Sequence, residues 1–181
     1  MFAQREMTKD QFYEFVMRPE NRDRNFEYIA GEIVEVVSNS KSSHEAMKIM
    51  GRVSVHVEDN NLGRCTGADG GYVIAGEDYI PDGAFISYVR QPVQPKVAYN
   101  PVAPDLAVEV LSPGNTSDEM TTKVGNYMAA GTVLWLVNPD KKIIDIHVPG
   151  QPVKRLRVGD FLEGGDVLPG FRLAVASIFA D

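Results

Sequence analysis

The stretch APDLAVEVLSP, residues 103–113, places a carboxylate inside an apolar run. Side chains alternate between the two faces of a strand, so a strand here puts Glu109 on the face of Ala107, with Val108 and Val110 on the other face. Burying an unpaired carboxylate costs several kcal/mol or makes it take up a proton. We therefore expect Glu109 to lie in a cleft, where a cation, a hydrogen-bond donor or water stabilises its charge.

A second acidic side chain could share a metal ion with Glu109, and spacing chooses between two candidates. Asp105 is on the same strand face, but the strand rise separates it from Glu109 by roughly 13 Å, so we expect it near the start of the strand, away from Glu109. Asp82 lies in IPDGAFIS, where Pro81 fixes the start of a neighbouring apolar run and Gly83 leaves space beside it. Carboxylates from adjacent strands suit a hard cation such as Mg²⁺ or Mn²⁺, which retains several waters. We predict that Asp82 and Glu109 share such an ion.

A positive group is also needed if this site hydrolyses a phosphodiester. A divalent ion can activate water and stabilise the transition state, and a lysine can orient that water. In the nuclease pattern P-D…(D/E)-x-K this lysine lies two residues after the second acid, where this chain has Leu111. Lys123, one turn into a predicted helix after the strand, can reach over the strand's end, so we predict that it approaches Glu109 to within a few ångströms. Taken alone, Lys123 also fits a side chain that extends from a buried helix face into water.

Three helices are predicted from capping boxes, in which a Ser or Thr is followed three residues later by Glu or Gln. The boxes are Thr8 with Gln11, Ser42 with Glu45, and Thr116 with Glu119. Apolar residues at helical spacing follow the second and third boxes, so two long helices are expected, one ending before Gly131.

The remaining apolar runs predict strands. NFEYIAGEIVEVV, residues 25–37, predicts a hairpin that turns at Ala30-Gly31. Residues 70–89 carry two strand-like runs broken at 76–78, and GRCTGADGG, which overlaps their start, has the composition of a turn. Further strands are expected at 105–111, at 132–137, at 143–148 and, as an edge strand, at 153–158.

The order of these elements predicts the fold class. A helix, three strands, a helix and a further strand form a mixed central sheet flanked by helices, so we expect an α/β (α+β) protein with an N-terminal hairpin. The 181 residues, 44% of them apolar, suffice for one domain with a core. We expect a single domain over residues 1–181, with a helix and hairpin at 8–37, the core at 42–148 and a closing region at 149–181.

Composition narrows the classes of function. No apolar run approaches the ~18 residues that span a bilayer, and the first residues lack the apolar centre of a signal peptide, so we expect a soluble, cytoplasmic protein. The one cysteine, Cys65, excludes an internal disulfide and a thiolate zinc cluster. The net charge of −7 repels nucleic acid at long range, so a nucleic-acid site needs a basic patch, a metal ion or both. The basic residues of 153–158 fit a solvated edge or a phosphate contact, and Asp145 and His147 are expected to face solvent.

Five segments together resemble the Uma family of restriction-endonuclease-like proteins, formerly a domain of unknown function, in the PD-(D/E)XK nuclease superfamily. They are MTKDQFYEFV, FEYIAGEIVEV, IPDGAFIS, APDLAVEVLSPGNTSDEMTTKVGNYMAAGTVLWLVNP and GGDVLPGFRL. The resemblance extends from about Met7 to Phe179. Its most specific part is the acid-bearing strand with Ser112-Pro113, followed by Lys123 and Tyr127.

The resemblance implies the restriction-endonuclease core, with Asp82 and Glu109 as the acid pair and Lys123 as the lysine. Gly83 stands where a bulkier apolar residue is expected. We predict a Mg²⁺-dependent DNA endonuclease in which Asp82, Glu109 and the backbone carbonyl of Val110 bind the ion. Lys123 would position the attacking water or help to deprotonate it.

Three accessory residues and two other functions stay open from the sequence. Glu27, His44 and Tyr127 are accessory candidates, although Glu27 also fits a pair across the hairpin and His44 a solvated residue near a helix cap. A homodimer would match the way restriction-type nucleases cut two strands. The same fold also suits a non-catalytic interaction domain, which the acidic balance favours, or a hydrolase of small phosphoesters.

Overall fold

The chain begins with a helix and a tight hairpin in this computed structural model, which describes residues 7–36 and 39–180. Helix α1 (Lys9–Val16) is capped by reciprocal hydrogen bonds between Thr8 and Gln11, as its capping box predicts. A short 3₁₀ helix, η1 (Pro19–Asn21), leads to the antiparallel strands β1 (Phe26–Ile29) and β2 (Glu32–Glu35). Ala30 and Gly31 turn between them with φ of 50° and 84°, which confirms the predicted hairpin.

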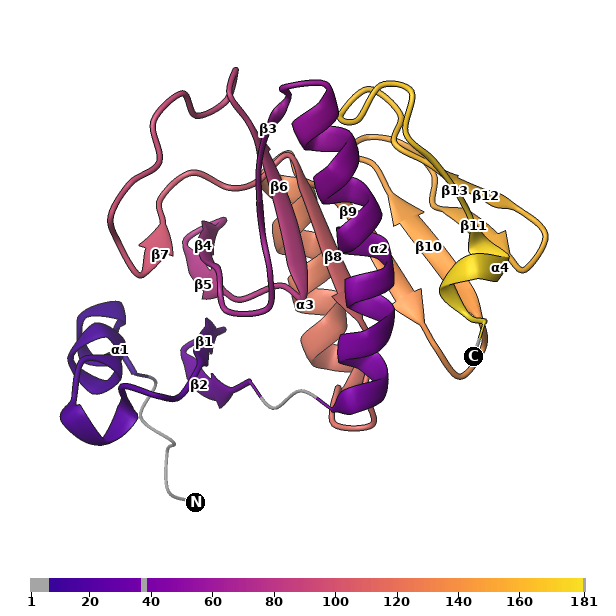
Figure 1. Cartoon of the computed structure of the whole chain (residues 1–181). Helices are drawn as coiled ribbons and strands as arrows, with labels where there is room; N and C mark the ends of the chain where they lie inside the picture. The colour runs from indigo at the N-terminus through magenta and orange to yellow at the C-terminus, as the bar shows by residue number, and fades with distance from the viewer. Residues whose placement is uncertain (1–6, 37–38, 181) are drawn as a thin grey trace.

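A mixed six-stranded sheet, here the core sheet, organises the rest of the chain. Its order is β11-β10-β9-β8-β6-β3, and β8 and β9 are its one parallel pair in the described residues. The strands are β3 (Gly63–Thr66), β6 (Gly83–Ser87), β8 (Leu106–Val110), β9 (Val133–Asn138), β10 (Ile143–His147) and β11 (Lys154–Arg157). Helices α2 (Ser40–Asp59) and α3 (Ser117–Ala129) lie on its opposite faces (Figure 1). The predicted α+β class, with a mixed sheet between helices, is confirmed.

A second, five-stranded sheet, here the accessory sheet, has the order β2-β1-β5-β4-β7. It adds β4 (Gly71–Ile74), β5 (Glu77–Tyr79) and β7 (Tyr99–Asn100) to the N-terminal hairpin. Figure 1 shows β1, β2, β4 and β5 beside the core sheet, and β1 contacts α3. An apolar cluster is buried between this sheet, β6, β8 and α3. It includes Ile29, Tyr72, Tyr79, Ala107 and Tyr127.

Two strand assignments from the sequence were wrong. Gly63–Thr66 is not a turn but β3, paired with β6 along an edge of the core sheet, although its residues show no apolar alternation. The run at 71–74 belongs to the accessory sheet, and the supposed break at Glu77 and Asp78 is strand β5. The true break is Ala75-Gly76, where φ is 51° and 91°. Pairing partners decide such strands, and a single sequence does not show them.

The start of α2 also differs from the prediction. Asn39 caps this helix, because its side-chain oxygen accepts from the backbone N–H groups of Lys41 and Ser42, so Ser42 with Glu45 is not its capping box. At α3 the predicted Thr116 accepts from the N–H of Glu119.

The C-terminal part completes the sheet and covers α2. Strand β11 is the predicted edge strand, and β12 (Phe161–Glu163), β13 (Arg172–Ala174) and α4 (Val175–Ile178) follow it. Asp145 and His147 are half-buried rather than solvent-facing. Arg155 pairs with Asp145 at 2.7 Å, and burial lowers the pKa of His147. Among the helices of the described ranges, none has the length and apolarity needed to cross a membrane.

Candidate active site

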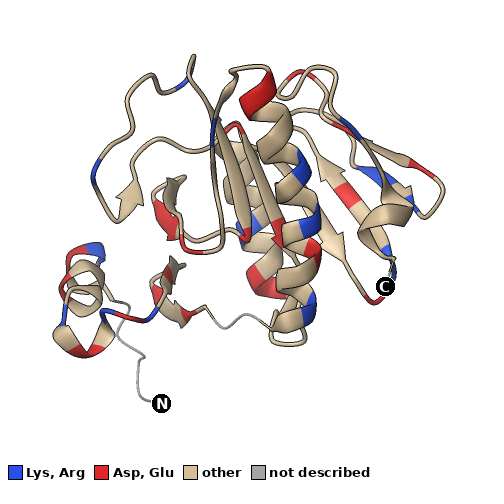
Figure 2. Cartoon of the chain, viewed as in Figure 1, with Lys and Arg blue, Asp and Glu red and all other residues tan. Residues whose placement is uncertain are grey.

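A cleft of about 280 Å³ opens between the C-terminal end of β8, the first turns of α3 and the hairpin of the accessory sheet. Its lining is rich in carboxylates, with Lys123 as the one basic side chain among the described lining residues. The acidic members are Glu27, Glu35, Asp82, Glu109 and Glu119. In Figure 2 the Lys and Arg segments are spread over α1, α2 and the C-terminal strands, with no single basic region.

Glu109 faces α3 from the fourth position of β8 and is 7% exposed. One oxygen, Oε1, lies 3.0 Å from the Lys123 ammonium and accepts a hydrogen bond of 2.7 Å from the Tyr127 hydroxyl. The predicted approach of Lys123 to Glu109 is therefore confirmed. The buried charge has the cation and the donor that its place in an apolar strand requires.

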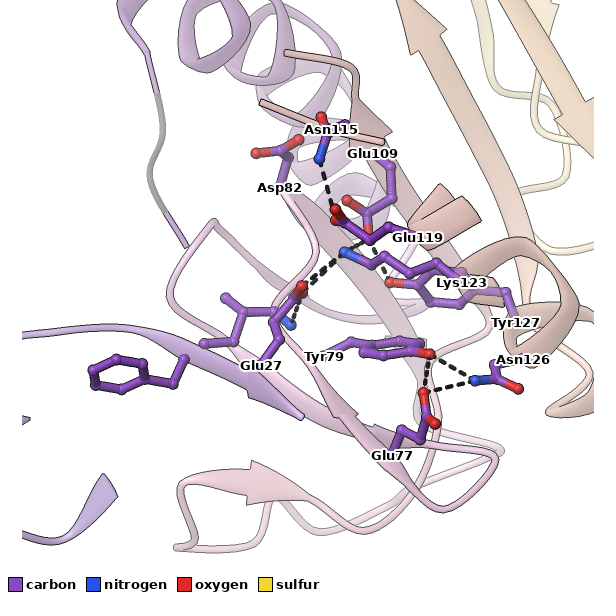
Figure 3. A network of polar contacts seen from close by, with 12 residues as sticks. Glu27, Glu77, Tyr79, Asp82, Glu109, Asn115, Glu119, Lys123, Asn126 and Tyr127 are labelled. Atoms are coloured by element: carbon purple, nitrogen blue, oxygen red, sulfur yellow. Dashed lines mark hydrogen bonds and ion pairs between the residues drawn. The ribbon is translucent and has the colours of Figure 1, made fainter. Parts of the chain in front are cut away.

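Lys123 lies at the centre of the cluster and is 3% exposed (Figure 3). Its ammonium contacts both carboxylate oxygens of Glu27, at 2.9 and 3.1 Å, as well as Glu109. Burial alone would lower the pKa of Lys123, but the negative charges of Glu109 and Glu27 raise it above its usual value. Lys123 is thus a group that is charged at neutral pH and held between two acids, not a side chain that extends into water.

Glu27 reaches this lysine from β1, in the accessory sheet, and is 3% exposed. The N–H of Ile80 donates to its Oε1 at 2.8 Å. Burial raises the pKa of Glu27 to about 7, against the opposing effect of Lys123. The pair across the hairpin that the sequence allowed does not involve this carboxylate, since its contacts lie on α3 and at Ile80.

Asp82 stands directly before β6, opposite Glu109. Gly83 pairs with Val108 in the antiparallel register, and one further step along each strand brings Asp82 to Glu109 on the same face. The Val110 N–H donates to Asp82 Oδ2 at 2.7 Å. Burial and the charge of Glu109 raise the pKa of Asp82 to about 6. Asp82 and Glu109 therefore face one another, and the charge of Lys123 does not offset the burial of Asp82 and its repulsion by Glu109.

This donor set fits a hard divalent cation. In the part of the chain that the structure describes, Oδ1 of Asp82 and Oε2 of Glu109 accept no hydrogen bond, and Val110 also lines the cleft. An ion here would relieve the repulsion that raises the pKa of Asp82. Residues 7–36 and 39–180 contain no cluster of three or more His, Cys, Asp or Glu side chains suited to a metal ion. Protein ligation would rest on the two acids and a carbonyl, with water in the other positions.

Three of the residues considered from the sequence lie elsewhere. His44 is exposed on α2 and is not among the described residues that line the cleft. Asp105 precedes β8, as predicted, where it accepts from the Ser87 N–H at 2.7 Å and pairs with Arg90 at 3.0 Å. Cys65 lies on β3, where burial raises the pKa of its thiol to about 11, so it is a poor nucleophile at neutral pH.

The sequence reasoning missed two polar groups. Glu119 and Asn115 line the cleft and are joined by a hydrogen bond of 3.3 Å. Glu119 precedes Lys123 by four residues, and that helical spacing could have revealed it. The second group, here the node, consists of Glu77, Tyr79 and Asn126, which are hydrogen-bonded to one another and lie below Lys123 in Figure 3. No signal pointed to it, because Glu77 was taken as part of a break between strands.

Comparison with known proteins bears on the family and the fold of this chain. The family model named Uma2, described as "Putative restriction endonuclease", matches residues 10–176, so the family resemblance predicted from the sequence is confirmed. A solved structure titled "putative nuclease belonging to DUF820" from Anabaena variabilis ATCC 29413 superposes with a TM-score of 0.80. It is 20% identical and covers 92% of this chain and 96% of its own, which shows a shared fold. No curated protein matches the chain.

Proposed function

This chain belongs to the Uma2 family, and we propose that it is a metal-dependent nuclease that hydrolyses phosphodiester bonds, with DNA as the substrate. The observation that carries the proposal is the Lys123 ammonium, 3.0 Å from Glu109 in a cleft that also holds Asp82. An acid pair with a buried lysine is a costly arrangement for a scaffold, because each desolvated charge must be compensated. Phosphodiester hydrolysis gives these groups a use.

Each residue has a distinct role in this proposal. Asp82, Glu109 and the Val110 carbonyl would hold Mg²⁺ or Mn²⁺, which supplies Lewis-acid stabilisation of the phosphoryl oxygens when bound. Lys123 stays protonated between Glu109 and Glu27, so it acts as a fixed positive charge that orients water and substrate. Tyr127 and Glu27 are accessory groups that hold Glu109 and Lys123 in place.

The acidity of the cleft bears on the substrate. Five lining carboxylates and one lysine repel a phosphate backbone, so the divalent ion would also be needed for the substrate to bind. A homodimer would supply two such sites for the two strands of a duplex.

Metal binding tests the site assignment. We expect isothermal titration with Mn²⁺ and Mg²⁺ to show a site that Asp82→Asn abolishes, because the substitution removes one of two carboxylate ligands. Asp10→Asn, at an exposed position on α1, is the matched control and should bind like the parent. Absence of any binding that depends on Asp82 would overturn the assignment.

Cleavage tests the reaction. Supercoiled plasmid incubated at low salt with Mn²⁺ should be nicked or linearised by the parent and left intact by Asp82→Asn. An RNA of matched length, assayed in parallel, tests the choice of DNA. A protein that binds metal through Asp82 but cuts neither nucleic acid would favour the non-catalytic interaction domain instead.

A further inference from the structure

The node connects the N-terminal hairpin, β5 and α3 through the carboxylate of Glu77. Glu77 Oε1 accepts from the N–H of Ala30 at 2.7 Å. Glu77 Oε2 accepts from the Tyr79 hydroxyl at 2.5 Å and from Asn126 Nδ2 at 2.9 Å. Asn126 also donates to the Tyr79 hydroxyl at 2.6 Å, which closes a triangle (Figure 3). Glu77 does not belong to the described lining of the cleft, so any effect on chemistry must pass through its neighbours.

The node joins the turn that directly follows β1, the strand of Glu27, to α3, the helix of Lys123. Ala30 follows β1, three residues after Glu27, and its backbone is held at a φ of 50° in the hairpin turn. Asn126 lies on α3 three residues after Lys123, which is almost one helical turn. The contact from Ala30 through Glu77 to Asn126 therefore runs beside the ion pair of Glu27 with Lys123. Both contacts join the accessory sheet to α3.

Tyr79 connects the node to the Lys123 ammonium, because its ring lies beside that ammonium. Its ring centroid lies 5.3 Å from Lys123 Nζ and 5.7 Å from the ring of Tyr127. Tyr79 is fully buried, and its hydroxyl is fixed by Glu77 and Asn126, so the ring has a defined position beside the lysine. Burial and the neighbouring Glu77 carboxylate raise the pKa of Tyr79, which keeps its hydroxyl a donor at neutral pH.

We propose that Glu77 is a positioning residue that clamps the accessory sheet to α3 and so sets Glu27 and Tyr79 against the Lys123 ammonium. The clamp rests on the proposed function only for its effect on catalysis. Its effect on Lys123 itself can be measured without any nuclease assay.

Amine acetylation under native conditions measures that effect. Acetic anhydride is added to the folded protein, and mass spectrometry compares acetylation of Lys123 with that of exposed Lys154 in the same sample. We expect the relative rate at Lys123 to rise about tenfold in Glu77→Gln, because local opening exposes a paired, buried amine. Either orientation of the glutamine amide leaves a donor facing another donor, at Ala30 or at Asn126.

Two further variants separate clamping from a general loss of stability. The double variant Glu77→Gln with Asn126→Asp restores the match of donors and acceptors, so Lys123 protection should return toward that of the parent. Glu32→Gln, an exposed acid on the same hairpin, should leave the relative rate unchanged. Parent-like protection of Lys123 in folded Glu77→Gln, or a rise in Glu32→Gln of the same size, would overturn the clamp.

A kinetic readout then connects the clamp to catalysis. With Mn²⁺ and plasmid, Glu77→Gln should lower kcat about tenfold with KM nearly unchanged, because Glu77 lies outside the described cleft lining. Rescue of kcat by the double variant supports positioning, and an unchanged kcat overturns it. If the parent cuts nothing, the proposed nuclease function fails, while the acetylation result still decides whether Glu77 holds Lys123 in place.

Discussion

The two faces of the core sheet differ most clearly along strand β8. Toward α2, Leu106, Val108 and Val110 pack into one large apolar cluster with the helix and the C-terminal segment. Toward α3, Ala107 packs against the accessory sheet, and Glu109 meets the charge of Lys123 and the hydroxyl of Tyr127. One five-residue strand thus has an apolar face and a charged face, both buried.

The apolar face of β8 stabilises the fold, whereas the charged face serves the cleft. Burying an aliphatic side chain such as Leu106 stabilises a protein by roughly 1.5–3 kcal/mol. A buried ion pair is often replaceable by apolar residues at no loss of stability, whereas removal of one partner is strongly destabilising. The charges on the α3 face are therefore not explained by stability, which favours a role in chemistry.

Lys123→Met is expected to have the largest effect on cleavage. Methionine keeps most of the apolar stem and removes the charge, so metal-dependent cleavage should fall by roughly 10³-fold. Because Glu27 and Glu109 lose the cation that pairs with them, the variant should also be less stable, and it is assayed well below its melting temperature. Plasmid cleavage at saturating Mn²⁺ measures the loss, and circular dichroism verifies the fold. Cleavage at the parent rate would remove Lys123 from the mechanism and leave only the acid pair.

Leu106→Ala tests the opposite face. Leu106 is fully buried in the apolar cluster, so the substitution should lower the free energy of unfolding by about 2–5 kcal/mol through lost burial and the cavity left behind. Well below its melting temperature, the variant should cut with the parent's kcat. A large fall in kcat without loss of stability would show that the two faces are not separable in this way.

The pH dependence of stability should also distinguish the two faces of the core sheet, because Glu27 and Asp82 lie on the α3 side. Burial raises the pKa of Glu27 to about 7 and that of Asp82 to about 6, and Lys123 and Glu109 are the charged groups that face them. The folded protein then binds more protons than the unfolded chain between about pH 4.5 and 7. These two groups therefore lower the free energy of unfolding as pH rises through that window, and they contribute no such penalty below it.

Denaturant titrations in EDTA from pH 4.5 to 8 measure this slope. The slope of Glu27→Gln should be flatter than that of the parent, because its amide does not titrate, and Leu106→Ala should shift the whole curve without changing the slope. Identical slopes for Glu27→Gln and the parent would contradict the burial of an ionisable Glu27.

Much of the candidate site could be predicted because each of its main residues stands out from its neighbours in the sequence. Glu109 interrupts an apolar strand, Asp82 follows a proline at the start of another, and Lys123 lies one turn into the helix that follows the acid-bearing strand. Asp105 could be set aside by strand rise alone. The helices of the core were likewise visible in apolar spacing, although a single sequence did not show that Asn39 rather than Ser42 caps α2.

Contacts between distant segments could not be predicted in the same way. The hairpin was predicted, but nothing in FEYIAGEIV shows that Glu27 points at a lysine 96 residues later. The strand at Gly63–Thr66 and the accessory sheet depend on pairing partners, and GRCT carries no apolar alternation to indicate them. The sequence therefore predicts the acids Asp82 and Glu109 at the charged face of β8. It does not predict that Glu27 of the accessory sheet covers this face and pairs with Lys123.

The smallest expected effect belongs to Tyr127→Phe, which removes one hydroxyl from the charged face. The ring stays packed beside Tyr79, and Glu109 keeps its contact with Lys123, so the variant should lose only about 1 kcal/mol of stability. Cleavage should fall about tenfold, because Glu109 loses the donor that fixes one of its oxygens.

Tyr72→Phe is the matched control, since its buried hydroxyl bonds to Thr66, away from the cleft. Both variants should lose similar stability, measured by urea titration, and only Tyr127→Phe should lose activity. Equal activities would mean that the Tyr127 hydroxyl serves packing alone, and the charged face would then narrow to Glu27, Asp82, Glu109 and Lys123.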